Sequence, residues 1–119
     1  MRLLVVEDDD GIAAPLVSGL RREGFEVERV ATGAAALAAG EPDLVLLDLH
    51  LPDLPGIDVL DELRRHPATS RTHVVVVSAD SSSSQQQQLR SRGVLDYLTK
   101  PFHVEDLLGL VDTYVGDRR

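Results

Sequence analysis

Short apolar runs alternate with segments of helical periodicity along the chain. The runs lie at residues 3–6, 25–30, 44–47, 74–77 and 94–98. The middle runs are continuously apolar, which is typical of strands buried on both faces, whereas apolar and polar positions alternate in residues 25–30. The pattern therefore predicts five strands.

The segments between these runs predict five helices. In the first, apolar residues recur at helical spacing from Ile12 to Leu20, and Gly24 is the expected stop. The other helices are predicted at residues 34–39, 57–65 and 103–115, and within residues 82–92.

Five strands in alternation with five helices predict an α/β fold of the (βα)5 type. Because parallel crossovers are right-handed, helices cover both faces of the sheet only if the winding direction reverses. A common solution is a doubly wound parallel sheet with the flavodoxin-like strand order 2-1-3-4-5. Its reversal lies between the first and third strands, and we expect the chemistry beyond their carboxyl ends.

Two features depart from this regular pattern. Residues 81–88 are four serines followed by four glutamines, so a helix here has a serine cap but almost nothing to bury in its first two turns. We therefore expect a frayed or mobile fourth helix. Pro15 is tolerated if it lies in the first turn of its helix and predicts a kink if it lies deeper.

Length and composition narrow the class of protein. The 119 residues, of which 43% are hydrophobic, predict a single domain over residues 1–119 with its own core and no output domain in this chain. The absence of cysteine excludes a disulfide framework, a thiolate metal site and a cysteine nucleophile. No apolar segment is long enough for a signal peptide or a membrane span, so we expect a soluble, cytoplasmic protein without membrane contact.

The net charge bears on possible partners. With 20 acidic and 12 basic residues, the formal net charge is -8. This negative field argues against direct nucleic-acid binding and suits a site that concentrates a divalent cation, although acidity can also serve solubility alone.

Polar side chains follow four of the predicted strands. Glu7 and Asp8 come directly after the first apolar run and Asp48 after the third, and those two strands are neighbours in the predicted order. Carboxylates brought together raise their pKa values or require a cation, and their hard oxygens suit Mg²⁺. Ser78 and Lys100 end the fourth and fifth strands on the same side of the sheet. These are the parts that transfer of a phosphoryl group to a carboxylate needs.

Each of these residues also has a purely structural interpretation. The acidic pair and Ser78 could cap helices, Asp48 could be a turn residue, and Lys100 could be a solvated surface lysine. The convergence of all of them at one edge of the sheet favours the functional interpretation.

Four segments carry a resemblance to the receiver domain of two-component response regulators. They are LVVEDD (residues 4–9), LLDLHLPDLPG (46–56), VVSA (76–79) and YLTKPF (97–102). The resemblance covers essentially the whole chain, in order, and the four motifs together are highly specific.

The resemblance implies roles for the residues at the strand ends. Asp48 is expected to accept the phosphoryl group from a phosphohistidine of a histidine kinase or a histidine phosphotransfer protein. Asp8 and Asp48, with the backbone carbonyl of His50, are expected to bind Mg²⁺ (or Mn²⁺), and Glu7 to act through a metal-bound water. Lys100 is expected to pair with the acceptor carboxylate and then with the phosphoryl oxygens.

The resemblance also implies how phosphorylation is transmitted. Ser78 is expected to hydrogen-bond the phosphoryl group, and Tyr97 to change rotamer and switch the surface near the fifth strand and the last two helices. His50 and Asp80 occupy positions that influence the loss of the phosphoryl group. The peptide bond between Lys100 and Pro101 is expected to be cis.

The chain also departs from the family pattern. Pro55 stands where many members have Asp, and Val94 and Leu95 replace a more common small or acidic stretch. The last two helices lack the interleaved charges that winged-helix regulators use to dimerise. We therefore expect a monomer or a weak, phosphorylation-dependent dimer, and a receiver of a hybrid histidine kinase or a stand-alone regulator.

Other classes of function make different demands on the sequence. A constitutive interaction module would have the fold without the chemistry, yet the site residues named above are intact. A flavin-binding protein would need a Ser/Thr/Gly-rich loop after the first strand, where this chain is acidic. A phosphatase with an aspartate nucleophile would need a second Asp at the position of His50.

Overall fold

The computed structural model describes residues 1–80 and 82–115, in which five strands alternate with five helices. The strands are β1 (Arg2–Val6), β2 (Glu26–Val30), β3 (Leu44–Asp48), β4 (His73–Ser78) and β5 (Asp96–Thr99). The helices are α1 (Asp10–Arg22), α2 (Gly33–Leu37), α3 (Gly56–Arg65), α4 (Ser83–Ser91) and α5 (Val104–Val115). The expectations for Ser81 and for residues 116–119 lie outside the described residues.

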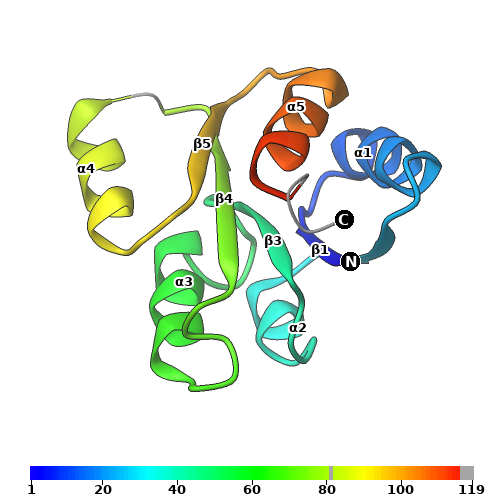
Figure 1. The fold of residues 1–119 in the computed structure, drawn as a ribbon. Coiled ribbons are helices and arrows are strands. Elements are labelled where there is room, and N and C mark those ends of the chain that lie inside the picture. Colours follow the sequence, from blue (N-terminus) through cyan, green and yellow to red (C-terminus); the bar gives the residue numbers. More distant parts are fainter. Residues whose placement is uncertain (81, 116–119) are drawn as a thin grey trace.

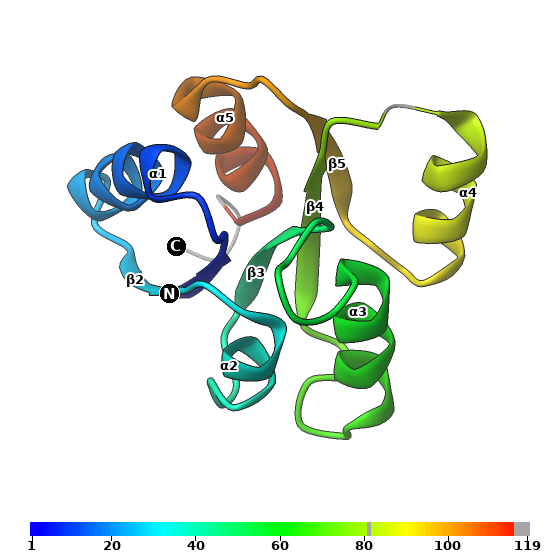
Figure 2. The ribbon, with the colours of Figure 1, turned by 180° about the vertical axis from the view of Figure 1, so that it is seen from behind.

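All strand pairs are parallel, and the order in the sheet is β2-β1-β3-β4-β5. Figure 1 and the opposite view in Figure 2 show α1 and α5 together on one side of the sheet and α2, α3 and α4 on the other. The predicted flavodoxin-like fold is therefore confirmed. The winding direction reverses at β1, so the carboxyl ends of β1 and β3 stand side by side.

The sheet separates two apolar cores, and its central strands supply both. Leu3 and Val5 of β1 belong to the core beneath α1 and α5, whereas Leu4 and Val6 belong to the core beneath α2, α3 and α4. β3 and β4 alternate in the same way. Because both faces of these strands are buried, their sequences are continuously apolar, as the sequence pattern indicated.

The last strand begins two residues later than predicted. Gly93 has a positive φ of 72°, and Val94 and Leu95 continue the turn that follows α4 before β5 starts at Asp96. The N–H of Leu95 already donates to the carbonyl of Val74, at 2.7 Å. Both apolar side chains pack against the cores from this connection, so the apolar run is longer than the strand.

Two residues shape α1, the helix that follows β1: Asp9 caps its start, and Pro15 interrupts its hydrogen bonding. The side chain of Asp9 caps α1 by accepting from the N–H groups of Gly11 (2.8 Å) and Ile12 (3.3 Å). Pro15 lies beyond the first turn, at an exposed position. It therefore removes one interior helix bond, to the carbonyl of Gly11, on the solvent side.

α4 is a helix with one fully buried side chain, Leu89, among its described residues. The hydroxyl of Ser82 caps its start by accepting from the N–H of Gln85 (3.4 Å). The first two turns, from the Ser/Gln tract, are exposed or half-buried. The expected fraying of this helix stays a prediction.

The end of α4 is held by two arginine side chains. Arg92 pairs with Asp61 of α3 at 2.7 Å. The guanidinium of Arg64, also on α3, donates to four backbone carbonyls of the loops before β4 and after α4. Arg64 thus joins two connections that are distant in sequence.

No helix in the described part of the chain is long and apolar enough to cross a membrane.

Arg64 gives a prediction for stability. Arg64→Met leaves four carbonyls without their donor, three of them in partly buried hydrogen bonds and one, of Gly93, in an exposed one, so the free energy of unfolding should fall by about 2 kcal/mol. The matched control is Arg65→Met, because Arg65 is exposed and, among residues 1–80 and 82–115, its one ion pair is with Glu62 a turn away on the same helix. Urea unfolding of both variants checks this, and equal losses would contradict the role of Arg64.

Candidate functional site

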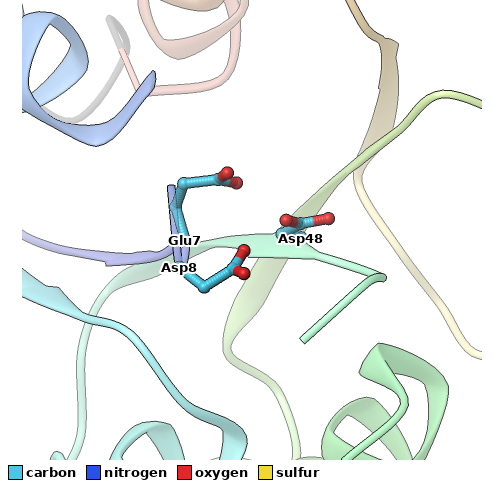
Figure 3. Close-up of side chains that lie close together, drawn as sticks. All are labelled: Glu7, Asp8 and Asp48. Atoms are coloured by element: carbon cyan, nitrogen blue, oxygen red, sulfur yellow. The ribbon is translucent and has the colours of Figure 1, made fainter. Parts of the chain in front are cut away.

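The register of the sheet brings three carboxylates to one edge. Val6 of β1 pairs with Leu47 of β3, so the next residues, Glu7 and Asp48, stand at the same level. Asp8 follows Glu7 in the loop to α1. One carboxylate oxygen of each acidic residue lies within 4.8 Å of the others. Figure 3 shows the three side chains converging from β1 and β3.

The three carboxylates differ in their exposure. Glu7 is 4% and Asp48 2% exposed, whereas Asp8 lies open to solvent. The cluster therefore consists of two buried carboxylates and one carboxylate, that of Asp8, at the surface. Three hard oxygen donors at this spacing fit a small divalent cation such as Mg²⁺.

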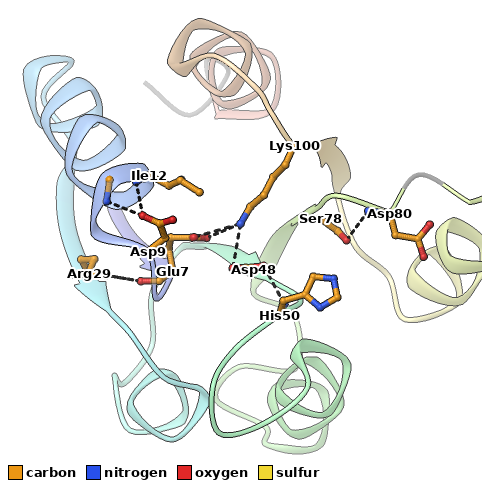
Figure 4. A network of polar contacts seen from close by, with 10 residues as sticks. Glu7, Asp9, Ile12, Arg29, Asp48, His50, Ser78, Asp80 and Lys100 are labelled. Carbon is orange, nitrogen blue, oxygen red and sulfur yellow. Dashed lines mark hydrogen bonds and ion pairs between the residues drawn. The ribbon is translucent and has the colours of Figure 1, made fainter.

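Lys100 brings a positive charge to this cluster from the end of β5. Its Nζ lies 3.2 Å from Oδ2 of Asp48 and 3.3 Å from both carboxylate oxygens of Glu7. Figure 4 shows its side chain reaching between the two carboxylates. The peptide bond to Pro101 is cis.

The pKa values reflect this crowding. Burial, with a hydrogen bond to Asp48 and the charge of Asp48, raises the pKa of Glu7 from 4.5 to about 7, against the opposing effect of Lys100. Burial alone would lower the pKa of Lys100, but the hydrogen bonds and charges of Asp48 and Glu7 raise it. One ammonium group does not balance the carboxylates, so the site favours a further cation or a proton.

The loop that carries Glu7 and Asp8 is held from both sides. Its Asp9 caps α1, so the acidic run supplies both a helix cap and two site residues. Arg29 of β2 donates through Nε (2.9 Å) and Nη2 (2.7 Å) to the backbone carbonyl of Glu7, and through Nη1 (2.7 Å) to Asp10. Sequence reasoning missed Arg29; the available signal was a basic residue near the end of the strand beside β1.

The loop after Asp48 is closed by backbone contacts. The N–H of His50 donates to Oδ1 of Asp48 at 3.0 Å, and the N–H of Gly56 to the carbonyl of Leu49 at 2.9 Å. A Cβ at Gly56 would lie 2.5 Å from Cα of Leu49 and 2.7 Å from the carbonyl oxygen of Asp48. Only glycine lets α3 begin this close to the strand end.

Asp53 ties the same loop to the neighbouring helix. Its carboxylate accepts from the N–H groups of Gly33 (2.8 Å) and Ala34 (3.0 Å) at the start of α2. These two backbone hydrogen bonds, with Ala34 first, lower the pKa of Asp53. Sequence reasoning did not single out this residue, because its partners are about twenty positions away.

Ser78 and Asp80 form the far side of the site. Ser78 is fully buried at the end of β4, and its hydroxyl accepts from the N–H of Asp80 at 3.1 Å (Figure 4). The carboxylate of Asp80 accepts from the N–H of Ser82 at 2.8 Å. The exposed Asp80 thus stands between the site and α4. The side chain of His50 is exposed as well, beside an open recess of about 500 Å³ that Asp8 also lines.

Tyr97 lies on β5, away from the carboxylates. Its ring packs against the core beneath α2, α3 and α4. Its hydroxyl is buried and has no hydrogen-bond partner among the described residues. A hollow of about 300 Å³ adjoins it between β5 and α4, lined also by Gln86 and Leu89.

Comparison with known proteins places this arrangement in a family. Residues 3–112 match the response regulator receiver domain. The cell cycle transcriptional regulator CtrA of Caulobacter vibrioides is 36% identical over 118 residues, covering 97% of this chain and 50% of that protein. The chain thus spans about half the length of the curated relatives it matches.

Solved structures agree with this match. The receiver domain of the Francisella response regulator 1452 is 28% identical, with a TM-score of 0.88, over 99% of this chain and 98% of that one. The receiver domain of the sensor histidine kinase PA1611 of Pseudomonas aeruginosa is 27% identical, with a TM-score of 0.86, over 97% of both chains. That structure has a magnesium ion coordinated in its active site cleft.

The chain belongs to the response regulator receiver domain family, a class of regulatory phosphoacceptors in two-component signalling rather than turnover enzymes. The resemblance in the four sequence motifs is thereby confirmed.

The raised pKa of Glu7 gives a prediction for pH dependence. The folded state favours protonated Glu7, so this stabilisation is full below about pH 4.5 and is lost as the pH rises through about 7. Metal-free protein should therefore be less stable to urea at about pH 8 than at about pH 5, and Glu7→Gln should flatten that difference. An unchanged slope in the variant would contradict this origin.

Gly56 gives a prediction for the geometry of the site. In Gly56→Ala the new methyl group meets backbone that cannot yield cheaply, so stability should fall by about 1–3 kcal/mol. Phosphorylation should slow by about tenfold or more, because the displaced backbone belongs to Asp48 and Leu49. Gly109→Ala in α5 is the control: nothing lies within 4 Å of its Cβ. A fully active Gly56→Ala variant would refute the argument.

Proposed function

We propose that Asp48 is the residue that accepts the phosphoryl group. The observation that carries this is its position: it is the buried carboxylate whose two oxygens are separately held, Oδ1 by the N–H of His50 and Oδ2 by Lys100. A carboxylate oxygen attacks phosphorus, the bond from phosphorus to the donor's imidazole nitrogen breaks, and an aspartyl phosphate forms.

We propose further that the carboxylate cluster holds Mg²⁺ (or Mn²⁺). Asp8 and Asp48 would bind it directly with the backbone carbonyl of His50, and Glu7 would act through a bound water. The donor set supports this, because it consists of oxygen atoms alone and carries more negative charge than Lys100 balances. When bound, the ion supplies positive charge that offsets the charge on the transferred group.

Lys100 and Ser78 are proposed to hold the phosphoryl oxygens. Nζ of Lys100 already contacts Oδ2 of Asp48, so it needs little movement to follow a group attached there. The hydroxyl of Ser78 accepts from the N–H of Asp80, which leaves its own proton free to donate to a phosphoryl oxygen. Hydrogen-bond donors that are already in place stabilise the negative charge that develops on the phosphoryl oxygens during transfer, and this is usually the largest catalytic effect in such sites.

Tyr97 is proposed to transmit the change. A buried hydroxyl without a partner is costly, so a rotamer that exposes it competes with the one in the structure. Movement of the Ser78 loop towards a phosphoryl group changes the space beside β5 and thereby selects between these rotamers. The surface formed by β5, α4 and α5 is then the output. The exposed side chains of His50, which follows Asp48 by two residues, and of Asp80, which follows Ser78 by two, are proposed to tune the loss of the phosphoryl group.

The family implies a histidine kinase as the partner, and we propose a histidine kinase or a histidine phosphotransfer protein as the direct phosphodonor. CtrA is named a transcriptional regulator, and PA1611 a sensor histidine kinase. Receivers similar to this chain therefore occur both in transcriptional regulators and in a sensor histidine kinase. We propose that this chain itself does not bind DNA and is a monomer or dimerises weakly when phosphorylated.

The first test is intact mass after incubation with a small-molecule phosphodonor and Mg²⁺. The wild type should gain one phosphoryl group, and Asp48→Asn should gain none. Asp58→Asn is the control, because Asp58 is an exposed carboxylate in the first turn of α3, outside the cluster. A gain of mass in Asp48→Asn, or none in the wild type, would overturn the assignment.

A further inference from the structure

We propose that Arg29 is a positioning residue for the metal site, and that it fixes the loop that presents Asp8. This rests on the proposed Mg²⁺ site and adds to it a residue outside the four motifs. Arg29 does not touch the reacting atoms. It acts through the backbone carbonyl of Glu7 and the carboxylate of Asp10, one on each side of Asp8 and Asp9.

The guanidinium group of Arg29 bridges the two ends of this loop through three hydrogen bonds. Nε and Nη2 both donate to the carbonyl of Glu7, at 2.9 and 2.7 Å, and Nη1 donates to Oδ1 of Asp10 at 2.7 Å. Figure 4 shows Arg29 reaching Glu7 from β2. The N–H of Glu7 also donates to the carbonyl of Val30 at 3.1 Å, so β2 holds the peptide groups on both sides of this residue.

Asp8 depends on these contacts more than the other carboxylates do. Glu7 and Asp48 are buried and share Lys100, whereas the side chain of Asp8 is exposed and has no hydrogen bond to another described residue. Its place in the cluster is set by the backbone around it. Arg29 fixes that backbone before Asp8, and the cap formed by Asp9 fixes it after.

Arg29 could act on the site through its charge or by positioning the loop, and the two roles predict opposite changes in Mg²⁺ affinity when Arg29 is removed. If Arg29 acted only as a charge, its removal would lower the positive potential near the carboxylates and strengthen Mg²⁺ binding. If it positions the loop, its removal lets Asp8 move away and weakens binding, as loss of residues that orient metal ligands does. Positioning is the larger effect here, because the guanidinium contacts the backbone rather than the ligand carboxylates.

The experiment is a calorimetric Mg²⁺ titration of the wild type, Arg29→Gln, Arg29→Lys and Arg21→Gln. We expect the Kd to rise by about tenfold in Arg29→Gln. Arg29→Lys keeps the charge but loses the forked donor, so its Kd should also rise. Arg21→Gln should bind as the wild type does, because the exposed Arg21 side chain hydrogen-bonds the carbonyl of Val27 and, among the described residues, no part of the loop after β1.

Each outcome of the titration decides something. A wild type that does not bind Mg²⁺ overturns the proposed metal site itself. A wild type that binds, with Arg29→Gln equal or tighter, overturns the positioning role alone. Should Arg29→Gln fail to fold by circular dichroism, Arg29→Lys decides: an unchanged Kd refutes the role, and a raised Kd supports it.

Discussion

The constraint on which this structure depends is the meeting of three carboxylates and one ammonium group at the edge of a sheet. Two of the carboxylates, Glu7 and Asp48, are buried, and within the described part of the chain Lys100 is the one cation paired with them. The pKa of Glu7, raised to about 7, is the sign of this imbalance. Such a concentration of negative charge is unfavourable for folding alone, and a bound Mg²⁺ would offset it.

Such a cluster persists only if the backbone beneath it cannot relax. The strands provide the first level of rigidity, because the register of β1 and β3 sets Glu7 beside Asp48. The connections provide the second: Arg29 holds the loop after β1, and Gly56 and Asp53 hold the loop after β3. The carboxylates are thus held by neighbouring residues of their own loops, such as Gly56, and by contacts that span about twenty positions, from Arg29 to Glu7 and from Asp53 to Gly33.

The sequence predicted the parts of the structure that depend on local patterns. Continuous apolar runs located the buried strands, and the alternation with helices indicated the strand order. Residues at strand ends, such as Asp48 and Lys100, could be named because parallel strands end at one edge. Arg29 and Asp53 could not be named in this way, because their partners lie about twenty positions away. Nothing in the sequence distinguishes them from other arginine and aspartate residues that make no such contact. The late start of β5 was missed because the side chains of Val94 and Leu95 pack against the cores although both residues precede the strand, so an apolar run does not mark where the strand begins.

The way in which α4 is attached separates two kinds of sequence change. Arg64 and Arg92 fix its last turn to α3, and Leu89 is its one fully buried residue among those described. Substitutions in the Ser/Gln tract therefore remove little from the core, and the carboxylates lie on other elements. A change on the outer surface of this helix can therefore alter what binds there without altering the carboxylate cluster, so recognition and the acidic site are separable in this fold.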